Sequence, residues 1–340
     1  MTSTKQHDPG IEAAAKRAAN SAAGSAGRRA EPFTLGGAEV RIGTAGWTDP
    51  LLTRAGAFYP PGTSSAEERL RYYASRFAFA EVDATYYALP ARQTAELWVE
   101  RTPGDFVFDI KAHALMTGHP TETKRLPKDL RDALPKALAA KARLYATDLP
   151  PELMDRVWEL FKDALAPLDS AGKLGAVLLQ FPPWFGPSRE NAALLLAARD
   201  SLRPLAASVE FRNPAWFEGR TGDRTMEWLT EHKVPLVISD TPPGTAQSVP
   251  RRVAVTAPSL SIFRLHGRRS ETWAKKGASV AERFRYLYDE KELKQVIPDI
   301  ADVGREAKRM HIVFNNCYGN YGTTNAMELF GMLWEGTAPA

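Results

Sequence analysis

Short runs of β-branched and aromatic residues recur along the chain from Val40 onward, and amphipathic helical patterns separate most of them. This alternation is typical of β/α units built around a parallel sheet. Eight runs are apolar enough to predict buried strands, at residues 41–44, 80–83, 106–110, 175–179, 208–211, 235–238, 261–265 and 311–314. Eight strands with intervening helices over about 300 residues predict an α/β fold, the (β/α)8 TIM barrel.

Two connections depart from a regular barrel. The segment after the sixth strand, residues 241–260, contains four prolines and no helical period, so we expect the helix there to be missing. The connection after the third strand is far longer than a simple crossover needs, and residues 112–173 are expected to form an insert plus helices. Because this insert follows the carboxyl end of a strand, we expect it to hang over the catalytic face.

The first 37 residues are rich in alanine, serine and glycine and contain almost no aromatic residues. Such a segment buries too little apolar surface to order itself, so residues 1–37 are expected to form a flexible tail. Residues 38–340 are expected to form a single TIM-barrel domain, which is long enough to bury a substantial core.

The chain carries 44 Lys and Arg residues against 40 Asp and Glu residues, a formal charge of +4, which permits an anionic partner without requiring one. The single cysteine excludes an intrachain disulfide and fits a reducing compartment. No apolar run approaches the roughly 20 residues of a membrane span, and the amino terminus lacks the apolar core of a signal peptide. We therefore expect a cytoplasmic protein without a membrane partner, whose oligomeric state the sequence leaves open.

Polar and aromatic residues stand at the ends of the predicted strands, where TIM barrels assemble their active sites. Acid/base catalysis or metal binding is expected from the carboxylates and the imidazole among them: Glu210, Asp83, His266 and, in support, Asp240. Ligand contacts are expected from their neighbours: Trp47, Tyr86, Lys111, Gln180, Arg212, Arg264, Asn315, Asn316 and Tyr318. Two of these, Arg212 and Arg264, are the predicted anion clamps, because a guanidinium presents a planar fork suited to phosphate.

The last predicted strand ends in two adjacent amides, an aromatic residue and two glycines, in the stretch "FNNCYGNYG". Buried amides must find hydrogen-bond partners, so a strand that only fills a core has little use for them. Asn325 and Glu328 have the spacing of a capping box that would start the last helix. Loops that feed a helix at this place often bind phosphate in this fold. The alternative is that the glycines serve the turn and the amides tie neighbouring loops together.

Cationic residues gather at or just after the strand ends: Lys111, Arg212, Arg264, Arg268, Arg269, Lys275 and Lys276. This clustering is the strongest chemical indication in the sequence, and it favours an anionic, phosphorylated ligand. The insert is also basic and contains aromatic residues, a composition that can follow a nucleic-acid backbone. The alternative for the insert is an ordinary solvated helix face.

Six motifs occur in order from about residue 41 to about residue 332: "RIGTAGWTDP", "FAEVDATYYALP", "KLGAVLLQFPPWF", "SVEFRNPAWF", "IFRLHGR" and "VFNNCYGNYGTTNAMEL". Together they resemble the YecE-like family (domain of unknown function 72). The resemblance implies a TIM barrel similar to those of endonuclease IV and the sugar isomerases, with no established activity. Asn213 and Cys317 stand where that family often has histidine, so a mechanism that needs an imidazole at either place is in doubt.

Metal-assisted hydrolysis and glycoside hydrolysis both remain open. With only His113, His119 and His266 near strand ends, a three-zinc cluster is not expected, whereas Asp83, Glu210 and Asp240 suit Mg²⁺ or Mn²⁺. Glu210 paired with Asp83 or Asp240 also suits a glycosidase. Its sugar platforms would come from tryptophans: Trp47, Trp184, Trp216 and Trp273. The tryptophans in "PPWF" and "NPAWF" are, however, more typical of lids packed on the barrel mouth.

Cys317 has no histidine near it in the sequence and is expected to be a buried bystander. The sequence thus predicts a barrel mouth that binds an anionic, phosphorylated ligand, with nucleic acid as a specific case, and that performs acid/base or metal-assisted hydrolysis. A binding module without catalysis and a carbohydrate-active barrel are the alternatives.

Overall fold

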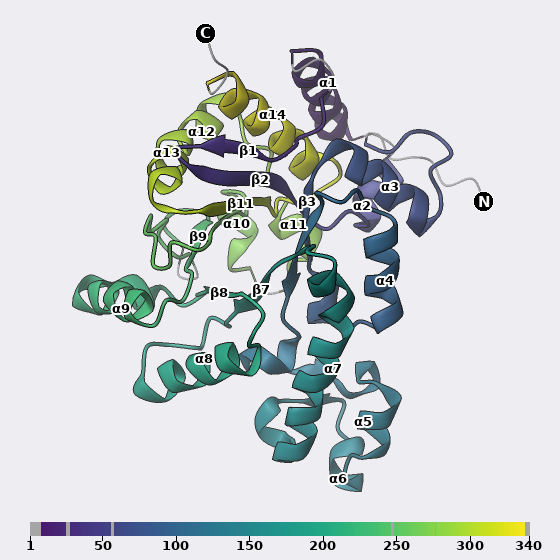
Figure 1. Ribbon diagram of the computed structural model, residues 1–340, viewed down its shortest axis with the longest axis vertical. Helices are drawn as coiled ribbons and strands as arrows, with labels where there is room; N and C mark the ends of the chain where they lie inside the picture. Colours follow the sequence, from purple (N-terminus) through teal and green to yellow (C-terminus); the bar gives the residue numbers. More distant parts are fainter. Residues whose placement is uncertain (1–7, 25–27, 56–57, 246–247, 276, 337–340) are drawn as a thin grey trace.

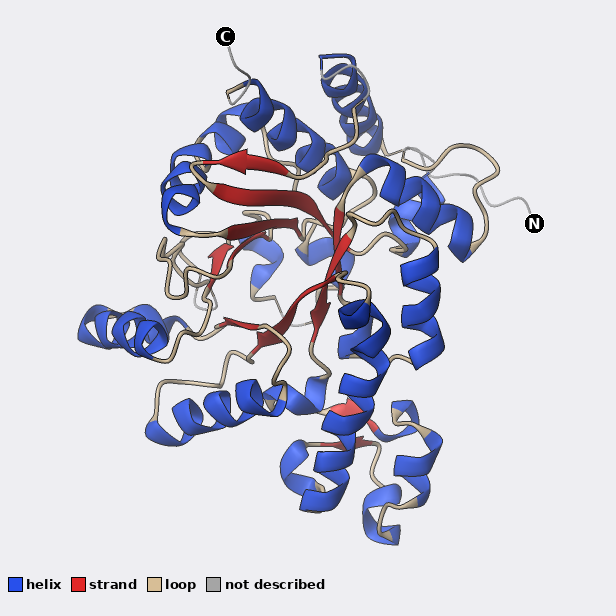
Figure 2. Cartoon of the chain, in the orientation of Figure 1, coloured by secondary structure: helices blue, strands red, loops and turns tan. Residues whose placement is uncertain are grey.

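The computed structural model describes residues 8–24, 28–55, 58–245, 248–275 and 277–336. At its centre a parallel sheet of eight strands curls into a nearly closed barrel with helices around it, and Figure 2 shows this layering. The strands are β2 (Ala38–Ala45), β3 (Phe79–Val82), β4 (Val107–Lys111), β7 (Leu174–Gln180), β8 (Ala207–Glu210), β9 (Val237–Asp240), β10 (Ser261–Leu265) and β11 (Arg309–Phe314). All eight predicted strands and the TIM-barrel fold are confirmed.

The barrel has one weak seam. Neighbouring strands follow the order β8, β7, β4, β3, β2, β11, β10, β9, and every pair along this path is parallel. The two ends of the path, β8 and β9, meet through a single bridge between Val209 and Leu236. A short strand, β1 (Phe33–Leu35), pairs antiparallel with β2 outside this path.

Strand alternation divides the core into two parts. A small cluster of Ala45, Phe79, Ala176, Leu178, Val237, Leu260, Ile262 and Val313 forms one part. The larger part lies between the strands and the surrounding helices. At Gly175 a side chain would collide with Asp109 and His311, whose carboxylate and imidazole lie 2.9 Å apart. Glycine is therefore required where these two buried side chains meet.

The helices form the outer layer (Figure 1). They are α2 (Pro50–Ala55), α3 (Ala66–Arg76), α4 (Arg92–Glu100), α7 (Pro151–Ser170), α8 (Arg189–Ser201), α9 (Gly219–Glu231), α10 (Ser270–Trp273), α11 (Val280–Arg283), α12 (Glu290–Lys294), α13 (Ile297–Glu306) and α14 (Tyr321–Glu335). Between β9 and β10 the described residues contain no helix, as the prolines predicted.

The long connection after β4 is confirmed as an insert. It contains the short strands β5 (Thr121–Glu122) and β6 (Arg143–Leu144) and the short helices α5 (Lys128–Asp132) and α6 (Lys136–Ala139). Figure 1 shows α5 and α6 beyond the barrel, at the end of α7. Its buried leucines, among them Leu130 and Leu144, give the insert a packed interior.

The amino-terminal segment differs from the flexible tail expected over residues 1–37. Residues Pro9–Gly24 form helix α1, which packs along α14 (Figure 1). Arg17 donates to both carboxylate oxygens of Glu328 at 2.7 and 2.8 Å, and Ala14 is fully buried. Alanine-rich sequence has high helix propensity, and the surface of α14 supplies the burial that the segment lacks alone. The rest of the expected tail includes residues 1–7 and 25–27, which lie outside the described residues.

Across the described ranges, no helix combines the length and apolar character needed to cross a membrane.

Candidate functional site at the barrel mouth

A pocket of about 700 Å³ opens beside the carboxyl ends of the strands. It brings together seven predicted site residues: Trp47, Asp83, Tyr86, Lys111, Gln180, Arg212 and Asn315. They follow or end β2, β3, β4, β7, β8 and β11, so their proximity results from the barrel itself. The predicted gathering of these residues at one mouth is therefore observed.

Several lining residues were not among the predicted site residues. They are the aromatic residues Tyr87, Trp98 and Phe284, together with Asp49, Arg101, His119 and Arg283. Trp273, one of the tryptophans named as a sugar platform, also lines the pocket. Most come from loops and helices far apart in the sequence, and no local pattern connects them. His119 is the contribution of the insert to the pocket lining.

Arg264 lies below the pocket and is completely buried. Its guanidinium makes a short contact with Glu210, approaches Glu81 at 2.5 Å and donates to Gln180 at 3.2 Å. The carboxylate of Asp83 is 3.7 Å away. These protein groups occupy Arg264, so the structure does not place it as the predicted anion clamp. It is the centre of a buried polar cluster that spans the barrel.

Glu210 belongs to the same cluster and does not line the pocket. Its carboxylate contacts Arg264, the Nε of Arg212 at 2.7 Å and the Nε2 of His266 at 3.0 Å. Burial alone would raise the pKa of Glu210, but the neighbouring Arg212, Arg264 and His266 hold it well below its usual value. Glu210 thus remains ionised as the counter-ion of two arginines.

His266 is also buried, and its surroundings keep it neutral. Burial and the nearby Arg212 lower the pKa of His266 to about 3. Asn315 donates to Nδ1 at 2.9 Å, so Nε2 carries the proton and donates it to Glu210. The predicted proton-transfer residue therefore connects Asn315 to Glu210 beneath the pocket.

Glu81 and Asp83 form the part of the cluster that reaches the pocket. Glu81 is buried, and burial with the nearby Asp83 raises its pKa to about 8, although Arg264 opposes the shift. Burial also acts to raise the pKa of Asp83, but Lys111 and Arg264 outweigh it and the pKa is lowered. A hydrogen bond from Glu81 contributes to this lowering. At neutral pH Asp83 is therefore the charged member of the pair and Glu81 holds the proton.

Asp240 lies elsewhere. Its carboxylate accepts from Arg268 at 2.9 Å, Arg251 at 3.1 Å and Tyr288 at 2.7 Å. The preceding residue, Ser239, instead contacts Glu210 at 3.4 Å, because successive strand residues face opposite sides. The prediction that Asp240 joins Asp83 and Glu210 is not met in the structure.

Asn316 and Tyr318 also lie outside the pocket lining. Asn316 donates to Asn325 and to the backbone of Tyr286, both at 2.9 Å, so this amide ties two loops to α14. Tyr318 donates to Asp8 at 2.8 Å, beside α1. Asn325 is buried inside α14, which begins at Tyr321, so the capping box predicted for Asn325 and Glu328 is wrong.

Two of the other cationic residues near strand ends lie close to carboxylates. Arg268 pairs with Asp240, and Arg269 lies 3.6 Å from Glu271. Lys276 lies outside the described residues. Within the described part of the chain, no group of three or more His, Cys, Asp or Glu side chains is arranged to hold a metal ion. The donors therefore do not fit the Mg²⁺ or Mn²⁺ site suggested by Asp83, Glu210 and Asp240.

Two further sequence expectations can be compared with the structure. Trp216 is buried and stacks on Phe211, as expected of a lid, but Trp184 is 64% exposed.

Cys317 lines the pocket and its thiol lies 3.3 Å from the Ala45 carbonyl. Burial and the nearby Asp49 and Asp83 raise the pKa of Cys317 well above its usual value, so the thiol stays protonated and is a poor nucleophile.

Proteins of known sequence and proteins of known structure are similar to this chain. The UPF0759 protein YunF of Bacillus subtilis (strain 168) is 29% identical over 306 residues, which cover 88% of this chain and 98% of that protein. A DUF72 family protein of Thermotoga maritima MSB8 has a structure with a TM-score of 0.68 and 28% identity, covering 87% of this chain and 99% of that one. A DUF72 family protein of Enterococcus faecalis V583 gives a TM-score of 0.70 and 25% identity over 88% of this chain and 97% of its own.

The family model described as "Protein of unknown function DUF72" matches residues 41–339, a region that begins within β2 and includes the other seven strands of the barrel. Its coverage agrees with the resemblance seen in the six sequence motifs. The chain therefore belongs to the DUF72 family.

Proposed function

We propose that the mouth pocket binds a small phosphorylated ligand and hydrolyses a phosphoester bond in it. The observation that carries this proposal is the charge of the pocket lining. Four cationic side chains, Arg101, Lys111, Arg212 and Arg283, face two carboxylates, Asp49 and Asp83. An excess of positive charge around a cavity attracts and concentrates anions.

The buried cluster leaves this charge uncompensated. Beyond the lining residues Arg212, Lys111 and Asp83, it contributes one cation, Arg264, and, with Glu81 protonated, one carboxylate, Glu210. These two charges cancel, so the excess of the lining, four cations against two carboxylates, remains. An anion in the pocket would compensate this excess, which borders a region of low dielectric constant where electrostatic attraction is strong.

Arg212 is the proposed phosphate contact. Its Nε faces Glu210 at 2.7 Å and its Nη2 donates to Gln180 at 3.3 Å, while none of the described residues accepts from Nη1. The guanidinium lies 5.6 Å from the ring centre of Trp273, which limits its movement. A held guanidinium with an unused donor atom at a cavity is suited to a phosphate oxygen.

Asp83 is the proposed general base. Its carboxylate is ionised and faces the pocket, with the ammonium of Lys111 at 3.5 Å. In the proposed step a water molecule attacks phosphorus and transfers a proton to Asp83. The P–O bond to the leaving group breaks on the opposite side of phosphorus, the leaving oxygen takes up a proton from solvent water, and Asp83 returns its proton to solvent. Lys111 and Arg212 would neutralise the charge on the phosphoryl oxygens.

The test combines binding with turnover. Because Trp47, Trp98 and Trp273 line the pocket, phosphate or a nucleoside monophosphate should change the tryptophan fluorescence. We expect Arg212→Met to weaken this binding about 10- to 100-fold, and Asp83→Asn to lower phosphoester turnover about 10²- to 10⁴-fold while the protein still binds. Arg203→Met, at a side chain that is 68% exposed, is the matched control.

The alternatives predict different outcomes. Binding that is sensitive to Arg212→Met without any product would favour a non-catalytic module. Absence of binding by both probes at low salt would reject the proposal. A glycosidase is disfavoured because two of the carboxylates expected to form its pair, Glu210 and Asp240, are held by arginines outside the pocket lining.

A further inference from the structure

Large aromatic side chains are unusually exposed near the pocket. Among the described residues, Trp184 is 64% exposed and Tyr87 is 48% exposed. An exposed tryptophan leaves a large apolar face in water, and such faces at a pocket edge are often contact surfaces. Tyr87 lines the pocket, and Trp184 follows the lining residue Pro183.

These two side chains are the ends of a continuous series of rings, here called the aromatic row: Trp184, His119, Tyr86 and Tyr87. Successive ring centres are 5.7, 5.2 and 5.0 Å apart. Burial, Lys111 and Arg212 lower the pKa of His119 to about 4, so the row contains four uncharged rings at neutral pH. The row runs from the loop after β7 to the loop after β3 and borders the pocket.

Two cationic side chains lie beside rings of the aromatic row. The ammonium of Lys111 lies 4.8 Å from the ring centre of Tyr86, and the guanidinium of Arg125 lies 5.8 Å from that of Tyr87. Arg125 belongs to the insert and shares Glu122 with Lys124, each at 3.2 Å. The row therefore continues into the basic surface of the insert.

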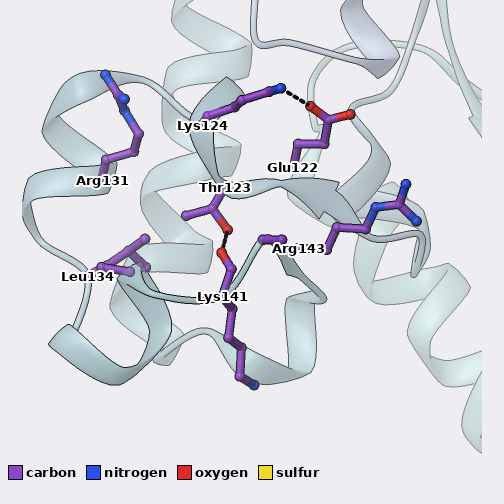
Figure 3. A pocket seen from close by; sticks show the side chains of 9 residues that line it. Glu122, Thr123, Lys124, Arg131, Leu134, Lys141 and Arg143 are labelled. Atoms are coloured by element: carbon purple, nitrogen blue, oxygen red, sulfur yellow. Dashed lines mark hydrogen bonds and ion pairs between the residues drawn. The ribbon is translucent and has the colours of Figure 1, made fainter.

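A second cavity, of about 540 Å³, follows on that surface (Figure 3). Four cationic residues, Lys124, Arg131, Lys141 and Arg143, line it with Glu122. Lys124 pairs with Glu122 at 3.2 Å and Lys141 with Asp148 at 2.8 Å, whereas Arg131 and Arg143 have no carboxylate partner among the described residues. Figure 3 shows the charged ends of Arg131, Lys141 and Arg143 pointing in different directions around the cavity. Charges that do not converge on one point suit a polymer with regularly spaced negative charges better than a single phosphate ion.

We propose that the aromatic row and the basic insert bind single-stranded nucleic acid, with bases stacked on the exposed end rings of the row, Trp184 and Tyr87, and phosphates beside the insert. The proposal rests on the proposed function in one respect, because the strand would deliver one of its phosphates to the mouth pocket. Unpaired bases expose the faces that stack on aromatic side chains, whereas a duplex keeps those faces inside.

The test is fluorescence anisotropy of the full chain with labelled single-stranded DNA and RNA of about 10 nucleotides, titrated at several salt concentrations. Trp184→Ala and Tyr87→Ala should each weaken binding about 5- to 100-fold. Leu194→Ala, at an equally exposed apolar side chain on α8, should leave it unchanged. Arg131→Ala and Arg143→Ala should each reduce the slope of log K against log salt by about 1, and Arg305→Ala should not.

Several results would overturn the proposal. Duplex DNA could bind as tightly as the single strand, or the Trp184→Ala and Tyr87→Ala variants could behave like Leu194→Ala. Polyphosphate could compete as well as the oligonucleotide while the ring variants have no effect, which would mean simple ion binding. Neutral oligosaccharides could bind the same rings without salt dependence while the oligonucleotide does not bind, which would identify a carbohydrate surface.

The pocket probes keep this proposal separate from the proposed function. If a nucleoside monophosphate binds and responds to Arg212→Met, but the oligonucleotide binds no more tightly, the nucleic-acid proposal fails and the pocket proposal stands. If the oligonucleotide binds and responds to Trp184→Ala, while phosphate and the monophosphate do not bind, the pocket proposal fails and the row remains a nucleic-acid surface.

Discussion

Arg264 shows how a single side chain can determine the arrangement of others. Its guanidinium stays charged at any relevant pH and is shared by Glu81, Glu210 and Gln180, all of which are wholly or largely buried. The ionised Glu210 compensates its charge, and the protonated Glu81 accepts a hydrogen bond from it. Removing it would leave two buried acids without their common partner.

We therefore expect Arg264→Met to lower the free energy of unfolding by about 3–5 kcal/mol. Urea unfolding followed by circular dichroism would measure the loss. Arg305→Met removes an exposed arginine that pairs with Asp302 and should change stability by no more than about 0.5 kcal/mol. A loss in Arg264→Met no larger than in this control would contradict the view that the buried charges depend on Arg264.

Protonation of Glu81 makes the stability of the fold depend on pH. Burial, the largest cause, raises its pKa to about 8 in the folded state, above the ordinary value of 4.5 for the unfolded chain. Because the folded state then binds the extra proton, this group contributes stability that is full below about pH 4.5 and is lost as the pH rises towards 8. Asp83 and Glu210, whose pKa values are lowered, act oppositely and lose their contribution only at acidic pH.

Glu81→Gln should remove this dependence. Between pH 5.5 and 7.5, stability of the parent protein should fall relative to the variant by up to about 1.4 kcal/mol per pH unit. Urea unfolding of both proteins at three pH values in this window would test the slope. Parallel pH profiles would show that Glu81 does not carry the proton.

At the scale of elements, strand alternation decides which predicted residues reach the site. Asp83, Lys111, Gln180 and Asn315 lie at the ends of their strands on the side that faces the pocket, whereas Asp240 and Asn316 are one residue out of phase. The strand pattern in the sequence predicted all eight strands, because their apolar runs are long and separated by helices. The apolar runs do not specify which side of the strand its last residue faces, and Asp240 therefore points away from the pocket that its position along the chain predicts.

Other parts of the site have no local signal. Glu81 stands two residues before Asp83 on the same side of β3, so the alternation rule could have identified it. The partners of Arg264 come from strands on other sides of the barrel. Trp273 and Arg283 end the short helices α10 and α11, and Phe284 follows α11, in a region too short in its elements to show a regular period. Such contacts depend on three-dimensional closure, which a single sequence does not specify. The sequence of helix α1 alone does not predict it, because its stability depends on the surface of α14.

Two glycines offer a matched test of packing at this scale. A Cβ at Gly175 in β7 would lie 2.4 Å from Asp109 and 2.7 Å from His311, whereas at Gly331 in α14 it meets nothing within 4 Å. Gly175→Ala should therefore cost about 1–3 kcal/mol in unfolding free energy, and Gly331→Ala should add about 0.5–1 kcal/mol through helix propensity. Thermal and urea unfolding of both variants would measure the difference. Equal effects would mean that the Asp109–His311 pair moves aside at little cost.

At the scale of the whole molecule, closure of the barrel is uneven. β2 and β11 pair over six consecutive positions, whereas β8 and β9 meet at one bridge, Val209 with Leu236. Few shared hydrogen bonds mean a low local free energy of opening. We expect the barrel to open first at the β8–β9 seam.

Native-state hydrogen exchange would test this expectation. Amides of β8 and β9 should exchange by sub-global opening, with free energies below those of β2 and β11, and Arg264→Met should lower protection at the seam most strongly. Uniform protection around all eight strands would show that packing, and not hydrogen bonding between strands, controls opening.

The position of Arg264 has a further consequence. It connects β10 to β3, β7 and β8, none of which is a neighbour of β10 in the sheet, and β8 forms one side of the seam. Arg264 therefore links strands on different sides of the barrel through the interior. Asp83 lies 3.7 Å from its guanidinium, and Arg212 is connected to it through Glu210. Substitutions of Asp83 or Arg212 that change the chemistry of the pocket are therefore expected to change the free energy of opening the barrel as well. Variation at these positions is thus constrained by two requirements at once, and compensating substitutions are expected on opposite sides of the barrel.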